Sequence, residues 1–351
     1  MLYSTDDLRI SGMQEVIPPA LLHEELPITD HASETVFNAR SLTQKIVHGN
    51  DDRLVVIVGP CSIHDPDAAR EYATRLKPLI TELKDDLHII MRVYFEKPRS
   101  VVGWKGLIND PYLDGSFKIN DGLRFARKLL LDLAEMGVPT GSEYLDLISP
   151  QYIADLISWG AIGARTTESQ AHRELASGLS CPVGFKNATD GGLQIAIDAC
   201  MSASKPHHFM SLTKAGHSAI FSTTGNPDCH VILRGGKAPN YDAESVQLTA
   251  ETIGRTGQKA LFMVDCSHAN SGKSHIKQEV VCRDVAGQIA HGEKRIMGMM
   301  LESNLIAGRQ NTKADEPLVY GQSITDACMA WDNTETLLHE LAEAVRQRRL
   351  K

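Results

Sequence analysis

The sequence lacks a long hydrophobic run, an internal repeat and an excess of basic residues. No uninterrupted apolar stretch approaches the ~20 residues that a membrane-spanning helix needs. The first ten residues, MLYSTDDLRI, do not show the basic and then apolar pattern of a signal peptide. With 36 Lys and Arg against 44 Asp and Glu, the formal net charge is −8, which argues against general affinity for nucleic acid or an anionic membrane. We therefore expect a cytoplasmic protein without nucleic-acid or membrane partners.

Cysteine is also scarce, and its distribution argues against a disulfide scaffold. The seven cysteines are odd in number and scattered through a long chain, which favours reduced thiols. Hydrophobic residues make up 42 % and charged residues 23 %, a globular balance that excludes wholesale disorder. A chain of 351 residues fits two ordinary domains or a single α/β barrel.

Short apolar runs alternate with helical patterns from residue 54 onward. The clearest run, Leu54–Gly59, is continuous and β-branched, which is typical of a strand buried on both faces of a parallel sheet. Eight such units are the number found in a (β/α)8 barrel. An open doubly wound sheet is the alternative, but no G-x-G-x-x-G follows the first strand. The predicted strands begin at residues 54, 88, 139, 161, 182, 230, 261 and 295.

Two segments stand outside this alternation. Residues 1–50, with a helical pattern over Ser33–Val47, are predicted to form an N-terminal extension packed on, or exchanged between, subunits. Residues 51–351 are predicted to form the barrel. Within it, two alternating runs on either side of Lys-Ala-Gly-His predict a β-hairpin at about 207–224, inserted before the sixth strand.

Five basic residues lie at or near the ends of four predicted strands. Because the C-terminal ends of barrel strands meet at one mouth, we expect these side chains to share a site. Arginine forks match phosphate and carboxylate oxygens, and lysines add point charges. The group predicts one substrate with several anionic groups, or two anionic substrates, and consists of Arg92, Lys97, Arg165, Lys186 and Arg234.

Three of the remaining strand ends, those of the first, seventh and eighth strands, carry potential metal ligands. Cys61, His268 and Glu302, completed by a later carboxylate such as Asp326, suit a divalent transition metal with an open position. Taken singly, Cys61 is more simply explained as a core thiol, and His268 as a loop or helix-capping residue. Their joint position at strand ends is what favours a site.

Several segments resemble the type I 3-deoxy-D-arabino-heptulosonate-7-phosphate (DAHP) synthases. The resemblance runs in order through nearly the whole chain. It implies a (β/α)8 barrel, usually tetrameric, that uses a divalent metal to condense phosphoenolpyruvate with erythrose 4-phosphate in the first step of the shikimate pathway. The matching segments are GPCSIHD (59–65), RVYFEKPR (92–99), GWKGLINDP (103–111), GARTTESQ (163–170), PVGFKN (182–187), ILRGGK (232–237), DCSHAN (265–270) and SITD (323–326).

The resemblance implies roles for individual residues. The metal, Mn²⁺ or a similar ion, would be held by Cys61, His268, Glu302 and Asp326. Lys97, Cys61 and His268 would be catalytic, with Lys97 protonating the developing alkoxide because a lysine crowded by cations gives up its proton more readily. Erythrose 4-phosphate would lie against Lys97, Pro98, Arg99, Ser100 and Asp326. Phosphoenolpyruvate would be held by Arg92, Lys97, Gly163, Ala164, Arg165, Lys186 and Arg234.

Feedback-controlled members of this family respond to phenylalanine, tyrosine or tryptophan, and the hairpin belongs to their regulatory apparatus. The pattern Phe209-Met-Ser211, together with Asp6-Asp-Leu-Arg9, resembles the phenylalanine-sensitive type. The N-terminal segment would reach the effector pocket from a neighbouring subunit, although a hairpin that only supports the tetramer is the alternative. The implied pocket residues are Asp6, Asp7, Pro150, Gln151, Leu175, Leu179, Ser180, Phe209, Ser211 and Phe221.

Two other functions compete with this prediction. A 3-deoxy-octulosonate 8-phosphate synthase shares the fold and phosphoenolpyruvate but takes a different aldehyde sugar, and the Lys97-Pro-Arg-Ser segment and the N-terminal segment argue against it. A catalytically silent binder of an aromatic amino acid or sugar phosphate is the second. The intact metal-ligand set and Lys97 count against that alternative.

Overall fold

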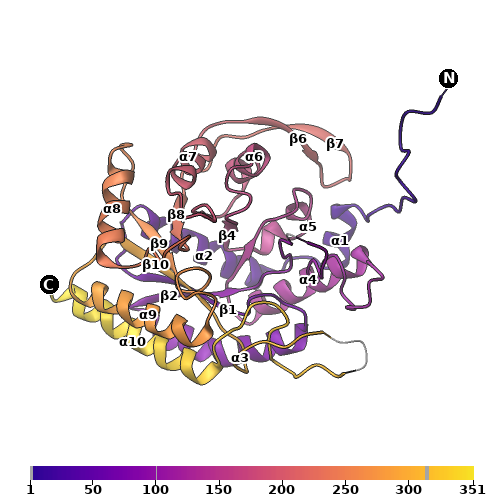
Figure 1. Ribbon diagram of the computed structural model, residues 1–351. Coiled ribbons are helices and arrows are strands. Elements are labelled where there is room, and N and C mark those ends of the chain that lie inside the picture. The colour runs from indigo at the N-terminus through magenta and orange to yellow at the C-terminus, as the bar shows by residue number, and fades with distance from the viewer. Residues whose placement is uncertain (1–2, 100, 313–315) are drawn as a thin grey trace.

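The computed structural model describes residues 3–99, 101–312 and 316–351. Eight parallel strands close into a barrel in which each strand pairs with its neighbours in chain order and the last pairs with the first (Figure 1). The predicted barrel is confirmed and the open sheet is wrong. The barrel strands are β1 (Leu54–Gly59), β2 (Leu87–Arg92), β3 (Thr140–Glu143), β4 (Trp159–Ile162), β5 (Val183–Lys186), β8 (Cys229–Leu233), β9 (Phe262–Asp265) and β10 (Ile296–Glu302).

Helices follow the strands and cover the barrel from outside. Asp65 begins α3 as the sequence predicts, because its carboxylate accepts hydrogen bonds from the backbone N–H groups of Asp67 and Ala68. Within the described ranges, no helix is long and apolar enough to cross a bilayer. The covering helices are α3 (Pro66–Glu82), α4 (Ile119–Glu135), α5 (Pro150–Ile153) with the short turn η1 (Ala154–Leu156), α6 (Gln170–Gly178), α7 (Gln194–Ala203), α8 (Ala243–Gly254), α9 (His275–Ala290) and α10 (Trp331–Arg349).

The fourth strand begins and ends earlier than predicted. We expected Ala161–Arg165, but β4 ends at Ile162, and the chain then turns with the backbone N–H of Thr166 bonded to the carbonyl of Gly163 at 3.0 Å. Gly163 lets the Glu143 carboxylate lie close to this turn, since an added Cβ would be 2.6 Å from Glu143 Oε1 and would displace that side chain. The turn therefore releases Arg165 from the sheet into the mouth.

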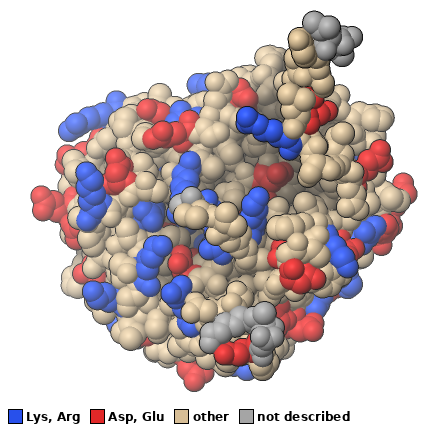
Figure 2. All heavy atoms as spheres, turned by 45° about the vertical axis from the view of Figure 1, so that its right-hand side comes forward, with Lys and Arg blue, Asp and Glu red and all other residues tan. Residues whose placement is uncertain are grey.

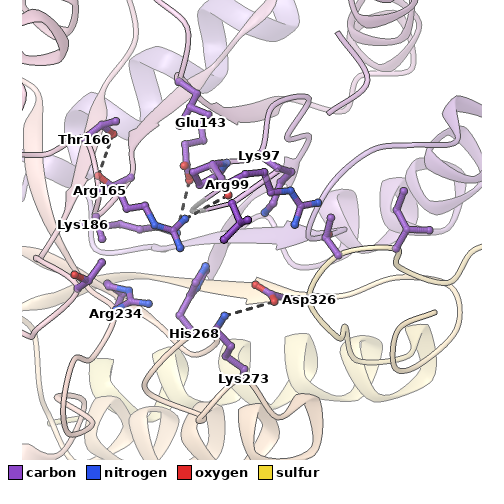
Figure 3. A pocket seen from close by; sticks show the side chains of 18 of the residues that line it. Lys97, Arg99, Glu143, Arg165, Thr166, Lys186, Arg234, His268, Lys273 and Asp326 are labelled. Atoms are coloured by element: carbon purple, nitrogen blue, oxygen red, sulfur yellow. Dashed lines mark hydrogen bonds and ion pairs between the residues drawn. The ribbon is translucent and has the colours of Figure 1, made fainter. Parts of the chain in front are cut away.

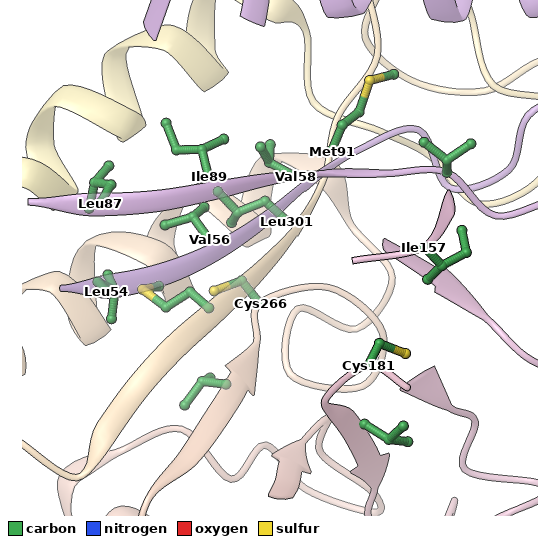
Figure 4. Packing of buried hydrophobic residues seen from close by; sticks show 14 of the residues in the cluster. Leu54, Val56, Val58, Leu87, Ile89, Met91, Ile157, Cys181, Cys266 and Leu301 are labelled. Atoms are coloured by element: carbon green, nitrogen blue, oxygen red, sulfur yellow. The ribbon is translucent and has the colours of Figure 1, made fainter. Parts of the chain in front are cut away.

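Two apolar layers stabilise the barrel. Alternate residues of β1 and β2, such as Leu54, Val56 and Ile89, belong to the large cluster packed against the helices (Figure 4). The intervening residues, among them Val55 and Ile57, belong to a second cluster that fills the barrel. Because both faces of each strand are buried, the strands are continuously apolar rather than alternating.

The N-terminal extension contains two helices, α1 (Pro19–Glu25) and α2 (Asp30–Val47). The sequence analysis did not predict α1, and α2 begins three residues earlier than expected because Thr29 caps it. In this single chain α2 packs on its own barrel: Arg40 donates to the carbonyls of Ala154 and Ile157, at 2.7 and 2.8 Å from Nη2. The division at residue 50 remains a prediction.

The predicted hairpin is confirmed as β6 (His208–Leu212) and β7 (Ser218–Ser222), an antiparallel pair between α7 and β8. It projects from the barrel near α6 (Figure 1). Along β6, His208 and Met210 are exposed while Phe209 and Ser211 are half-buried, so one face is turned toward the protein. The two ends of the hairpin are joined, because the N–H of Thr223 donates to the carbonyl of His207 at 2.9 Å.

Candidate active site

The carboxyl ends of the strands surround a cavity of about 380 Å³. Figure 2 looks onto a hollowed face with Lys and Arg side chains around the depression. Figure 3 shows the interior, in which His268 lies between Arg234 and Asp326. The predicted residues that line the cavity are Lys97, Pro98, Arg99, Gly163, Ala164, Arg165, Lys186, Arg234, His268 and Asp326.

Two arginines in this cavity have few protein partners. Among the described residues, neither Arg165 nor Arg234 forms an ion pair. Arg165 Nη1 is 3.4 Å from the carbonyl of Pro98, and Arg234 Nη1 is 3.4 Å from that of Gly235. The Nε of Arg234 is buried without a hydrogen-bond partner. Because a buried donor without a partner costs ~1–3 kcal/mol, these groups fit an anionic ligand.

Arg92, at the end of β2, is fully buried and tightly held. Its Nη2 donates to Glu302 Oε1 at 2.9 Å and to the carbonyl of Cys61 at 3.2 Å. The guanidinium lies 3.5 Å from the ring centroid of Tyr94, within the range of a cation–π contact. Arg92 therefore joins the basic group to the potential metal ligands.

Lys186, at the end of β5, is buried between two carboxylates. Its Nζ is 3.2 Å from Asp265 and 3.9 Å from Glu143. Although burial alone acts to raise the pKa of Asp265, the charges of His268 and Lys186 hold that pKa well below its usual range. The acids beneath the basic group thus lower the cost of burying several cations together.

Three predicted metal ligands converge. Donor atoms of Cys61, Glu302 and Asp326 all lie within 4.8 Å of one another. The fourth, His268, is not part of that group, but its Nε2 lies 3.9 Å from Glu302 Oε1. Burial and the nearby Glu302 raise the pKa of the Cys61 thiol. A thiol, two carboxylates and an adjacent imidazole are donors that suit a divalent transition metal, so the residues present fit the predicted ion.

Lys97 lies between the two groups, but its expected acidity is wrong. Its Nζ is 3.2 Å from Cys61 Sγ and from the Cys61 carbonyl. Burial and the charge of Arg92 act to lower the pKa of Lys97, whereas Cys61, Glu302 and Glu143 raise it. The net shift of the pKa is upward, because the acidic neighbours outweigh the cations.

The segment predicted to hold erythrose 4-phosphate lies at the outer rim of the cavity. Pro98 and Arg99 line it, and Arg99 Nε donates to the carbonyl of Trp104 at 2.7 Å. The remaining nitrogens of this guanidinium stay available to a phosphate. Ser100 lies outside the described residues.

The predicted effector residues fall into two groups. The hairpin, α5 and α6 come together: Phe209 and Phe221 are opposite each other with ring centroids 6.1 Å apart, and Lys214 donates to the carbonyl of Gln151. Pro150 and Gln151 begin α5, Leu175 is in α6, and Leu179 and Ser180 follow it, whereas Ser211 is on β6. Asp6 and Asp7 are exposed in an N-terminal segment that runs away from the body (Figure 1).

Four further residues at the site were missed or given no role by the sequence analysis. Asp265 lies within the DCSHAN segment, and Tyr94 lies two residues after Arg92, so sequence proximity was a signal for both. Lys273 lines the cavity 3.8 Å from Asp326. Arg309 also lines it, from an irregular loop whose sequence carries no periodic signal.

Comparisons with known proteins agree with this geometry. The chain is 62 % identical over 349 residues to the Phe-sensitive phospho-2-dehydro-3-deoxyheptonate aldolase of Escherichia coli, covering 99 % of this chain and 100 % of that one. A tyrosine-inhibited enzyme of the same name from Candida albicans is 55 % identical over 351 residues, with 98 % and 95 % covered. The solved structure of the aldolase from Francisella tularensis has a TM-score of 0.95 at 54 % identity, covering 97 % of this chain and 100 % of that chain.

A family model agrees with the individual relatives. The model described as the DAHP synthetase I family matches residues 27–339, which include all eight barrel strands and every residue of the cavity. Because both the fold and the residues at the strand ends agree, the chain belongs to the DAHP synthetase I family.

Proposed function

We propose that this site condenses phosphoenolpyruvate with erythrose 4-phosphate and water to give DAHP and phosphate. The observation that carries the proposal is one cavity in which arginines without carboxylate partners adjoin a thiol–carboxylate group. The first feature fits two anionic substrates, and the second fits a Lewis-acidic ion. The activity is a transferase reaction at the start of aromatic amino-acid biosynthesis.

Phosphoenolpyruvate lies against the basic group in this proposal. Arg165 and Arg234 supply the free guanidinium donors, and the backbone at Gly163-Ala164 lies close to the phosphate. Arg92 and Lys186 complete the set from beneath, each held by a buried acid. These residues position two anions that would otherwise repel each other, which is the main task of the site.

A divalent metal ion would be held by Cys61, His268, Glu302 and Asp326, and would supply Lewis acidity toward the aldehyde oxygen. The methylene carbon of phosphoenolpyruvate forms the new C–C bond with the aldehyde carbon. Water adds to the adjacent carbon, and the C–O bond to phosphate then breaks. Lys97, whose Nζ lies 3.2 Å from Cys61 Sγ, would donate a proton from its ammonium group to the developing alkoxide.

Pro98 and Arg99, at the rim of the cavity, together with Ser100, which lies outside the described residues, hold the phosphate of erythrose 4-phosphate in this proposal. Arg99 is the charged group of this segment, and its position beside Lys97 brings the aldehyde end of the sugar toward the inner cavity. Asp326 contacts the same substrate from the opposite side of the cavity.

Phenylalanine inhibits the enzyme from the hairpin site in this proposal. The half-buried Phe209–Phe221 pair offers an apolar contact for an aromatic ring, and the adjoining α5 and α6 supply polar groups. The exposed Asp6 and Asp7 extend away from their own body, which fits a contribution to a neighbouring subunit in a homotetramer. The Phe-sensitive relative is more similar to this chain than the tyrosine-inhibited one, at 62 % against 55 % identity.

Release of phosphate from phosphoenolpyruvate tests the function. With Mn²⁺, we expect release only when erythrose 4-phosphate is present, and one phosphate per DAHP formed. Equal or faster release with arabinose 5-phosphate would indicate the octulosonate synthase instead. Binding of phosphoenolpyruvate without any release would indicate the silent binder.

A further inference from the structure

Asp265 lies at the end of β9 beneath both halves of the site. It is fully buried, and its Oδ2 is 3.2 Å from Lys186 Nζ and 2.8 Å from His268 Nδ1. Its Oδ1 accepts hydrogen bonds from the N–H of Ser267 at 3.0 Å and from its hydroxyl at 2.6 Å. A buried carboxylate is tolerated only when it is paired, and here the two pairing groups belong to different subsites.

Contacts with Ser267 and Asp265 hold Nδ1 of His268 away from the cavity: the Ser267 hydroxyl lies 2.6 Å and Asp265 Oδ2 lies 2.8 Å from it. Nδ1 lies against Asp265 and Ser267, which leaves Nε2 on the side of Glu302, 3.9 Å from Oε1. An imidazole held at one nitrogen by a carboxylate presents the other nitrogen as a metal ligand in a fixed orientation.

The contact with Asp265 also helps to hold the backbone conformation of His268. His268 has a φ of +54°, in the left-handed region that a non-glycine residue seldom adopts. The turn is closed by the N–H of Lys273, which donates to the carbonyl of His268 at 2.7 Å. Such a conformation persists only when surrounding contacts determine it, and the carboxylate of Asp265 is one of them.

Asp265 also contacts residues of both groups through one oxygen. Lys186 belongs to the basic group and His268 to the group that fits a metal ion, and both lie against Oδ2 of this buried carboxylate. Without that charge, the ion and the lysine would repel each other across a poorly screened interior.

We propose that Asp265 is a positioning residue that joins the metal site to the phosphoenolpyruvate site, by orienting His268 and by offsetting the repulsion between the metal ion and Lys186. The inference rests on the metal-dependent function proposed above. In this proposal, the affinity for the metal ion and the affinity for phosphoenolpyruvate both depend on the Asp265 carboxylate.

The affinity for Mn²⁺, measured on metal-stripped protein by EPR of the free ion, tests this role without reference to activity. Asp265→Asn keeps the shape of the side chain and removes its charge, and should weaken Mn²⁺ binding by ~10- to 100-fold. Phosphoenolpyruvate brings negative charge close to Lys186 and the metal site, and can partly replace the charge that Asp265→Asn removes. Adding phosphoenolpyruvate should therefore tighten Mn²⁺ binding more in this variant than in the wild type. The ratio of the Mn²⁺ dissociation constants without and with phosphoenolpyruvate measures this difference.

Two further variants separate charge from fold. Lys186→Met removes the repelling cation and retains Asp265, so it should tighten Mn²⁺ binding, which general damage to the fold would not do. Ser267→Ala removes the hydroxyl that contacts both Asp265 and His268 Nδ1 but keeps the carboxylate, and should weaken Mn²⁺ binding less than Asp265→Asn does. Thermal unfolding of each metal-free variant establishes that it is folded.

The outcomes distinguish this role from the proposed function. A wild-type protein that binds no Mn²⁺ would overturn the metal-dependent function itself. Wild-type binding, together with a folded Asp265→Asn variant of unchanged Mn²⁺ affinity, would overturn only the role of Asp265. Unchanged or weaker binding by Lys186→Met would likewise overturn the charge-offset argument.

Discussion

The two ends of the barrel carry similar charged side chains but pair them differently. At the amino end, Arg53 binds Asp51 through two nitrogens, at 2.9 and 2.7 Å, and Arg349 binds Asp52 and Asp86 at 2.8 and 2.6 Å. At the carboxyl end, Arg165 and Arg234 reach only backbone carbonyls. Arg53 and Arg349 at the amino end therefore pair with acids of the chain, whereas Arg165 and Arg234 at the mouth, unlike Arg92, remain available to a ligand.

The size of the cavity does not distinguish the two ends. The cavity lined by Arg53 and Arg349 is about 840 Å³, larger than the 380 Å³ at the mouth. The difference lies in the arginines: Arg53 and Arg349 pair with carboxylates, whereas Arg165 and Arg234 have no carboxylate partner among the described residues. In a barrel, charge pairs at the amino end serve stability, while unpaired cations at the carboxyl end serve binding.

The largest expected effect on turnover comes from replacing Cys61. Cys61→Ala should lower turnover by ~10³-fold or more at ordinary Mn²⁺ concentrations, because Lewis-acid stabilisation is worth several kcal/mol. Steady-state rates over a Mn²⁺ titration would measure this. The matched control is Cys200→Ala, which removes an equally buried thiol from α7 and should keep nearly normal turnover. Full activity of Cys61→Ala would show that the Cys61 thiol is not needed at the metal site.

The next largest effect on turnover is expected from replacing Lys97, which lies between the basic group and the potential metal ligands. Lys97→Ala should reduce kcat by ~10²-fold or more, because its proton is needed in the transition state. The exposed Lys105→Ala, from the neighbouring loop, serves as the control. A Lys97→Ala variant with normal kcat and only a raised KM would contradict the acid role.

Removal of an unpaired cation should separate binding from stability. Arg234→Ala should raise the KM for phosphoenolpyruvate by ~10- to 150-fold, which corresponds to ~1.5–3 kcal/mol for a charged hydrogen bond. Its free energy of unfolding should not fall, since the buried Nε has no partner to lose. Comparison of KM values with urea unfolding curves tests both parts. A variant that loses stability but keeps its KM would place Arg234 among the structural arginines.

The opposite pattern is expected at the amino end. Arg349→Ala should lower the free energy of unfolding by ~0.5–1 kcal/mol, since its ion pairs are partly exposed and screened by solvent. Its KM for phosphoenolpyruvate should remain within the error of the wild-type value. A changed KM with unchanged stability would break the contrast between the two ends.

The smallest effect on uninhibited catalysis is expected at the hairpin. Phe209→Ala should abolish inhibition by phenylalanine and leave the uninhibited rate within ~2-fold, because an effector acts only through its preference for one conformational state. Met210→Ala alters the exposed face of the same strand and should remain inhibited. Inhibition curves with phenylalanine, tyrosine and tryptophan would check both variants. Wild-type enzyme that responds only to tyrosine would show that the effector is wrong.

The barrel was predictable because its strands have a strong local signal. A run such as Leu54–Gly59 is apolar at every position, since both faces of the strand are buried. Helix α1 gave no comparable signal: it has seven residues, begins at Pro19 and depends on the burial of Leu22 against the rest of the protein. Its formation is a consequence of tertiary packing.

The candidate site was predictable in its members and less so in their interactions. Parallel strands bring their ends together, so the residues that follow them could be grouped from the sequence. The pairing of Lys186 with Asp265 could not be predicted, because these two residues lie far apart in the chain, on β5 and β9. The raised pKa of Lys97 has the same origin, since the acids that outweigh Arg92 lie on other strands.

The way in which the hairpin is inserted has a consequence for the evolution of such a barrel. Its two ends meet at the hydrogen bond between Thr223 and His207, and β5 pairs directly with β8 although the hairpin lies between them in the chain. The segment can therefore enter or leave the gene as one piece without breaking the register of any barrel strand. Under the regulatory role proposed for the hairpin, control by an effector is an accessory that evolution can exchange while the catalytic barrel remains unchanged.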